Sequence, residues 1–142
     1  MKIGFKKGDH WYSGGVRALT HSQWSHTAAL ISGRIYESTA LKGTQDTAGV
    51  RDYPCTPEIE AEYEWYDSCV PDEIALKRYE EIKGYPYDYL SLLAFFTLKI
   101  RDSRRFYCYE TILYMMVGDV SARVTPEIIL WTEIQLRSTY AK

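Results

Sequence analysis

The chain has 142 residues, a length typical of one domain, and its 46% hydrophobic and 25% charged residues are typical of a globular protein. A net charge of −2 gives no electrostatic support for nucleic-acid binding. The N-terminus carries no apolar signal-peptide stretch, and the longest apolar runs are too short to cross a membrane. We therefore expect one soluble, cytoplasmic domain over residues 1–142, with no transmembrane segment. The sequence leaves virion packaging, export by another route and the oligomeric state open.

A β-hairpin is predicted over residues 26–39, after a short helix that Gly14-Gly15 suggests over 13–22. Two strand-forming runs flank Ser32-Gly33, and the glycine supplies the positive φ that a tight turn requires. With a two-residue loop, His26 and Glu37 lie on one face as diagonal neighbours. A carboxylate beside an imidazole fixes its tautomer and favours its charged form, which suits proton transfer. The alternative is a surface ion pair without a catalytic role.

The rest of the chain carries strand patterns first and helix patterns afterwards. A short strand is expected over 50–53, and the alternation of apolar and acidic residues over 60–68 predicts a half-buried antiparallel strand. The last apolar run, residues 128–131, predicts a helix that is buried on more than one side. Strand patterns that precede helix patterns favour an α+β fold in which an antiparallel sheet packs against helices. Four helices are expected in the second half, over residues 71–84, 87–100, 108–118 and 125–137.

Cys108 is the candidate nucleophile among three cysteines that form no CxxC pair. It follows a basic stretch and begins an apolar helical run, which places its thiol at a helix N-terminus. There the helix dipole and free N–H groups favour the thiolate and can hold an oxyanion. His26 fits the role of base, and Glu37 fits the role of the group that orients it. The alternative is a buried structural cysteine. A disulfide between Cys55 and Cys69 is left open.

An ordered set of short motifs resembles a known family. The set is similar to the circularly permuted, papain-like branch of the NlpC/P60 superfamily, in particular its YiiX/YaeF-like group, which is related to lecithin:retinol acyltransferase-like proteins. The likeness spans roughly residues 4–118. The motifs that carry it are Gly8-Asp9, Ser25-His26, Glu37, Tyr87-Asp88 and Cys108-Tyr109-Glu110.

This resemblance implies a permuted papain-like fold and a thiol hydrolase or acyl transferase. It makes Cys108 the nucleophile, His26 the general base and acid, and Glu37 the residue that orients His26. The substrate-binding residues that we predict with it are Tyr87, Asp88 and Tyr107, which would line or brace the groove. Asp88 as the cap of a following helix is the alternative for its motif.

We expect a cysteine hydrolase that cleaves an amide, peptide-type bond through a thioester intermediate, without a cofactor. The expected partner is a peptide or acyl-bearing substrate. An acyl transferase or lipid hydrolase is the first alternative, and an apolar groove near Phe95, Phe96 and Tyr114 would favour it. The second alternative is a binding or structural module without turnover. The three histidines lack metal-ligand spacing, so no metal site is expected.

Overall fold

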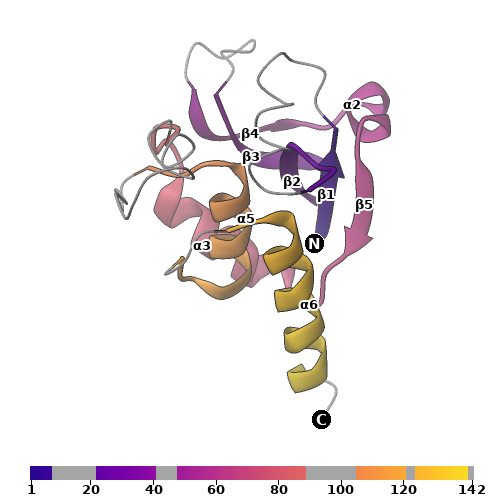
Figure 1. The fold of residues 1–142 in the computed structure, drawn as a ribbon. Helices are drawn as coiled ribbons and strands as arrows, with labels where there is room; N and C mark the ends of the chain where they lie inside the picture. The colour runs from indigo at the N-terminus through magenta and orange to yellow at the C-terminus, as the bar shows by residue number, and fades with distance from the viewer. Residues whose placement is uncertain (8–21, 41–47, 89–104, 121–123, 141–142) are drawn as a thin grey trace.

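The computed structural model describes residues 1–7, 22–40, 48–88, 105–120 and 124–140 (Figure 1). In this part of the chain, five strands form one antiparallel sheet in the order β4-β3-β2-β1-β5. α5 packs on β2 and β3, and α3 and α6 contact α5 in turn. The predicted α+β class, an antiparallel sheet packed against helices, is confirmed. The strands are β1 (Lys2–Lys6), β2 (His26–Ile31), β3 (Arg34–Thr39), β4 (Gly49–Pro54) and β5 (Glu64–Asp67), and the helices are α2 (Pro57–Ala61), α3 (Asp72–Ile82), α5 (Cys108–Val117) and α6 (Pro126–Tyr140).

The predicted hairpin is present as β2 and β3 with a two-residue loop. Ser32 and Gly33 have φ values of 48° and 74°, and two successive positive φ angles are the mark of a type I′ turn. Ile31 pairs with Arg34 directly across this turn. Because the register is the predicted one, the imidazole and the carboxylate that were expected to be neighbours do share one face of the sheet.

The strand predicted over residues 60–68 is only partly present. Its first two residues belong to α2, and β5 covers only Glu64–Asp67. The Ile59 amide donates a hydrogen bond of 3.4 Å to the Thr56 hydroxyl, and Pro57 follows at the first helical position. A capping residue followed by proline is a strong helix start, and here it outweighs the alternating pattern.

β1 is a strand that the sequence analysis does not predict. It lies between β2 and β5 and pairs with both. Gly4 at its centre lies beneath the Trp65 ring, and a Cβ atom at this position would come within 2.5 Å of the Trp65 Cζ3 atom. A five-residue segment with glycine at its centre shows little alternation, so its role becomes clear only from its neighbours in the sheet.

Three of the predicted helices are confirmed as α3, α5 and α6. α3 buries Ala75, Tyr79 and Ile82 on the predicted face, although it begins at Asp72, one residue after the proline expected to start it. α5 ends at Gly118, whose φ of 76° is the left-handed conformation common at helix C-termini.

Parts of several predictions lie outside the described residues. The helix predicted over 13–22 is outside them except for Ser22, which is not helical. The helix predicted over 87–100 is outside them except for Tyr87 and Asp88, which are also not helical. The Gly8-Asp9 motif falls in the same category.

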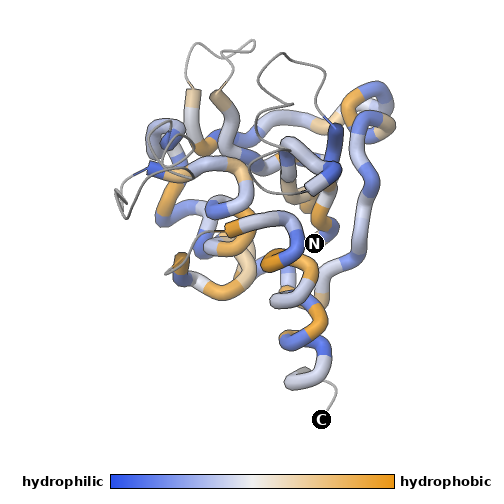
Figure 2. The backbone as a smooth tube through the Cα atoms, viewed as in Figure 1, coloured by the Kyte–Doolittle hydropathy of each residue, from blue (hydrophilic) through white to orange (hydrophobic). Residues whose placement is uncertain are grey.

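The prediction that α6 is buried on more than one side is wrong. Ile129 is fully buried, whereas Trp131 and Ile134 are each 62% exposed. Figure 1 shows the reason: α6 projects away from the sheet, so only part of it has a neighbour to pack against. Figure 2 shows that hydrophobic residues nevertheless continue along the projecting part.

Two clusters of buried residues cover the two faces of the sheet. The larger cluster lies between the sheet and the helices, and it includes Ala29 and Tyr36 from the hairpin together with Cys108. The smaller cluster contains Ala28, Ile35 and Tyr63. Since side chains alternate along a strand, His26 and Glu37 point to the same face as this smaller cluster.

Candidate active site

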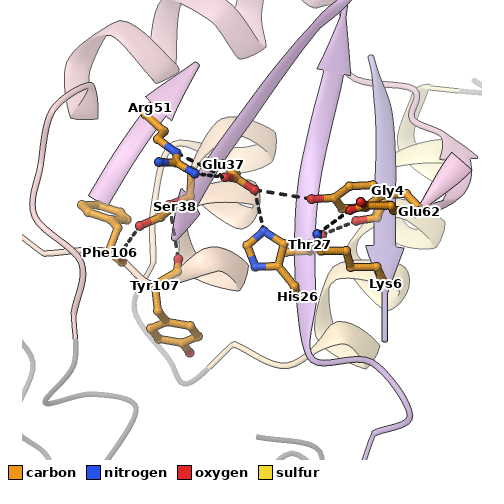
Figure 3. Close-up of polar contacts among 12 residues, drawn as sticks. Gly4, Lys6, His26, Thr27, Glu37, Ser38, Arg51, Glu62, Phe106 and Tyr107 are labelled. Atoms are coloured by element: carbon orange, nitrogen blue, oxygen red, sulfur yellow. Dashed lines mark hydrogen bonds and ion pairs between the residues drawn. The ribbon is translucent and has the colours of Figure 1, made fainter. Parts of the chain in front are cut away.

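His26 and Glu37 form a close pair at one end of the hairpin. The His26 Nε2 atom lies 2.6 Å from Glu37 Oε2 (Figure 3). The Glu37 side chain is 4% exposed and the His26 side chain is 15% exposed, so the pair is shielded while the imidazole still reaches the surface. Shielding strengthens the interaction, because fewer water molecules compete for either group. The predicted pairing of these two residues is therefore present in the structure.

Cys108 is the first residue of α5, as predicted. Tyr107 precedes it in an extended conformation, and the Tyr107 amide donates a hydrogen bond of 3.3 Å to the Glu110 carboxylate. This contact fixes the first turn of the helix. The amides of the first turn have no intrahelical acceptor, and they lie at the positive end of the helix dipole. Both features favour negative charge beside the Cys108 sulfur.

Cys108 is among the groups that raise the pKa of His26, so its side chain lies within interaction range of the imidazole. Because Nε2 already contacts Glu37, the nitrogen left for the sulfur is Nδ1. His26 begins β2, Cys108 begins α5, and α5 packs on β2. The imidazole is at the end of its strand, so it can approach the thiol although its side chain starts on the face away from α5.

The pKa values of the pair are shifted in opposite directions. Burial alone would lower the pKa of His26, but the Glu37 charge and the contacts with Cys108 outweigh it and raise that pKa to about 9. Burial alone would raise the pKa of Glu37, but the charges and hydrogen bonds of His26 and Arg51 lower it to about 2. At neutral pH the pair is therefore an imidazolium beside a carboxylate.

Buried hydrogen bonds hold the Cys108 segment against the hairpin. The Ser38 hydroxyl donates to the Phe106 carbonyl at 2.6 Å (Figure 3). The Phe106 amide donates to the Pro86 carbonyl at 3.2 Å, and the Asp88 amide donates back to the Phe106 carbonyl at 3.4 Å. Ser38 follows Glu37 directly in β3, so one strand positions both the carboxylate and the chain that carries the nucleophile.

The three predicted substrate-binding residues are all buried beside this segment. Tyr87 forms a parallel bridge with Phe106, and Asp88 is 1% exposed. Tyr107 is 2% exposed, and its hydroxyl donates to the Val124 carbonyl at 3.0 Å and accepts from the Val124 amide at 2.9 Å. These contacts brace the chain on either side of Cys108. A role of the three residues in substrate binding stays a prediction.

Sequence reasoning missed the other groups that contact Glu37. Two nitrogens of Arg51 donate to Glu37 Oε1, at 3.1 and 3.3 Å. The Tyr63 hydroxyl donates to Oε2 at 3.4 Å, and burial together with the nearby Glu37 charge raises the pKa of Tyr53. Arg51 lies directly opposite Glu37 in the β3–β4 register. The strand expected over 50–53 contains Arg51, but the sequence gives no register between that strand and the hairpin.

The remaining cysteines are separate from the site. Cys55 and Cys69 are free thiols of intermediate exposure, so the disulfide between them that the sequence left open is not formed. Burial raises the pKa of each of these two thiols. In the described ranges, no three or more His, Cys, Asp or Glu side chains are grouped to hold a metal ion. No helix of this part of the chain is both long and apolar enough to span a bilayer.

Comparisons with protein-family models, with curated proteins and with solved structures found no match to this chain. The resemblance to the permuted NlpC/P60 group therefore stays a prediction from the motifs. The chemistry of the site is what indicates a function. A thiol at a helix N-terminus, an imidazolium and a buried carboxylate together suit nucleophilic attack assisted by proton transfer.

Proposed function

We propose that the chain is a cysteine hydrolase that cleaves an amide, peptide-type bond through a thioester intermediate. Cys108 is the nucleophile, His26 transfers the proton, and Glu37 orients the imidazole. The observation that carries the proposal is the 2.6 Å contact between His26 and Glu37, together with Cys108 at the start of α5 within interaction range of the imidazole. Triads are recognised by such geometry and not by their order along the chain.

The reaction begins with the Cys108 proton on His26. The thiolate attacks the substrate carbonyl carbon, a C–S bond forms, and the carbonyl electron pair moves onto oxygen. Amides in the first turn of α5 donate to this oxyanion. When the intermediate collapses, the C–N bond breaks and the leaving amine takes the proton from the imidazolium. The products of this step are a free amine and a thioester on Cys108.

Hydrolysis of the thioester completes the cycle. Neutral His26 accepts a proton from water as the water oxygen attacks the thioester carbon. Collapse of the second tetrahedral intermediate breaks the C–S bond and releases the acid. The thiolate and the imidazolium are thereby restored. Throughout, Glu37 accepts a hydrogen bond from Nε2, so Nδ1 stays directed at the sulfur and the charged ring is stabilised.

The rate of alkylation by iodoacetamide at neutral pH tests this proposal, with the other two cysteines as internal controls. Cys108 is 3% exposed, whereas Cys55 and Cys69 are more accessible. Exposure alone therefore predicts that Cys108 reacts most slowly. Activation predicts the reverse, because the thiolate is the reactive form. Mass spectrometry of the labelled peptides gives the three rates separately.

We expect Cys108 to be labelled first and to lose this preference in His26→Ala. Arg34→Gln is the matched control, because Arg34 pairs with Asp52 near the turn end of the same sheet. Slow and equal labelling of all three cysteines in the wild-type protein would contradict the proposal. That outcome would favour the alternative of a binding or structural module.

Turnover assays then distinguish the bond types. Peptide anilides test amide hydrolysis, and long-chain acyl esters with and without an added amine or alcohol test lipid hydrolysis and acyl transfer. We expect release from the anilides that is lost in Cys108→Ser. The apolar groove that would favour acyl chains involves Phe95 and Phe96, which lie outside the described residues, while Tyr114 donates to Glu81 at 2.7 Å. If only the long-chain acyl esters are turned over, the substrate is a lipid acyl group and not an amide.

A further inference from the structure

We infer that Arg51 is a positioning residue of this site, acting on the nucleophile through Glu37 and His26. The inference rests on the proposed function and extends the row of three side chains to four. β4 supplies this fourth member, β3 the carboxylate, β2 the imidazole and α5 the sulfur. Figure 3 shows the Arg51 guanidinium and the His26 ring on opposite sides of the Glu37 carboxylate.

The division of the Glu37 oxygens is the first argument. Both contacting nitrogens of Arg51 bind Oε1, and the imidazole binds Oε2. A guanidinium presents its N–H groups in a rigid planar fork, and here two of them converge on one oxygen, which anchors Oε1. The oxygen that faces His26 therefore has one preferred direction. Without the fork, rotation of the Glu37 side chain would move Oε2 away from Nε2.

Burial is the second argument. The Arg51 side chain is 14% exposed and the Glu37 side chain is 4% exposed, so little water replaces a lost contact. Among the residues that the structure describes, the titratable groups around the carboxylate are His26 from β2, Arg51 and Tyr53 from β4, and Tyr63 from the segment before β5. Arg51 and the protonated imidazole are the two cations among them. Removing Arg51 leaves the imidazolium as the one cation in this set that balances a buried negative charge.

The same two strands provide a matched control for a merely structural role. Arg34 in β3 donates from Nε at 3.0 Å and from a terminal nitrogen at 2.6 Å to Asp52 in β4. This pair also joins β3 to β4 through an arginine and a carboxylate. Its contacts lead to Tyr79 and Lys83 and not to the imidazole. Arg34→Gln therefore removes a similar cross-strand contact and leaves the contacts among the four side chains of the site unchanged.

The experiment compares wild type, Arg51→Gln, Arg51→Lys and Arg34→Gln by two readouts. The first is the alkylation rate of Cys108 relative to Cys55 and Cys69. The second is NMR titration of the His26 ring, assigned by the loss of its signal in His26→Gln. The chemical shift of that signal should change at acidic pH when Glu37 becomes protonated, and the midpoint of this change is the acidic inflection. Circular dichroism establishes which variants remain folded.

We expect Arg51→Gln to slow alkylation of Cys108 about ten- to a hundredfold, as misplaced catalytic groups do, and to move the acidic inflection upward by at least about one pH unit. Arg51→Lys restores the charge but not the fork, so it should slow alkylation by only a few fold. Arg34→Gln should match wild type in both readouts. Wild-type values in a folded Arg51→Gln or Arg51→Lys protein would overturn the inference.

The two hypotheses fail in different ways. If wild-type Cys108 shows no preferential labelling, the proposed function fails, whatever the variants do. If wild-type Cys108 is labelled preferentially and Arg51→Gln preserves that preference, only the role of Arg51 is rejected.

Discussion

Two carboxylates on neighbouring strands, Glu37 and Asp52, are held by arginines across the same sheet but have different surroundings. Asp52 accepts from Tyr79 at 2.7 Å, from Arg34 and from Lys83, so it joins β4 to both β3 and α3. Glu37 gives one oxygen to an arginine and the other to a histidine. The pKa of each carboxylate is lowered to about 2. The low pKa and the arginine are thus shared, and what marks a candidate active site is the histidine that contacts a thiol.

The largest difference between the two carboxylates should appear in the reactivity of Cys108. Glu37→Gln removes the charge that raises the pKa of His26, so that pKa falls from about 9 toward its ordinary value of 6.5. We expect alkylation of Cys108 to slow by about a hundredfold, as when a catalytic group is displaced by about 1 Å. Asp52→Asn should leave the rate unchanged. Equal effects of the two variants would remove the distinction between the sites.

The next difference concerns the pH dependence of stability. The folded pKa of His26 is above its unfolded value of 6.5, so its contribution is fully present below pH 6.5 and is lost as pH rises through about 9. The folded pKa of Glu37 is below 4.5, so its contribution is present above pH 4.5 and is lost as pH falls toward 2.

Thermal unfolding between pH 2 and 10 tests this prediction. Wild type should be most stable between about pH 4.5 and 6.5, with losses on both sides. Glu37→Gln should reduce the loss of stability at alkaline pH, because protonated His26 is then no longer stabilised by the charge of Glu37. Asp52→Asn should reduce the acidic loss and preserve the alkaline one. An alkaline loss that is unchanged in Glu37→Gln would show that His26 and Glu37 do not titrate as a pair.

A smaller effect is expected from the tyrosines that contact the two carboxylates. Tyr79 donates to Asp52 at 2.7 Å and Tyr63 donates to Glu37 at 3.4 Å. A hydrogen bond to a charged group contributes about 1.5–3 kcal/mol, and a long bond contributes less. Tyr79→Phe should therefore lower the free energy of unfolding by about 2 kcal/mol and Tyr63→Phe by less than about 1 kcal/mol. Urea denaturation measures both, and the reverse order would contradict the assigned contacts.

The smallest predicted effect is the response to salt. The Arg34 side chain is 44% exposed, whereas that of Arg51 is 14% exposed. Exposed ion pairs are screened, so the cost of Arg34→Gln should be small at low salt and should vanish at ~1 M salt. The cost of Arg51→Gln should persist in high salt. Urea denaturation at two salt concentrations gives both costs.

The hairpin could be predicted because its information is local. Ser32-Gly33 favours a type I′ turn, that turn fixes the register, and the register places His26 beside Glu37. The start of α5 at Cys108 and its end at Gly118 are local in the same way. These elements account for the three proposed catalytic residues, and for that reason the candidate triad could be named from the sequence.

The rest depends on contacts between distant parts of the chain. No turn signal joins β3 to β4 directly, so the register that places Arg51 opposite Glu37 was not predicted. β1 is recognisable only from its position between two other strands. The error at Trp131 has a related cause, because an apolar helix pattern does not say whether a neighbouring element is present to cover each side.

The contact between the Cys108 sulfur and the His26 ring is the central claim, and the pKa of His26 measures it most directly. NMR titration should give a value of about 9 in the wild-type protein and a clearly lower value in Cys108→Ala, because the contacts with Cys108 are among the causes that raise it. A His26 pKa near 6.5, or a raised value that is the same in both proteins, would contradict the account.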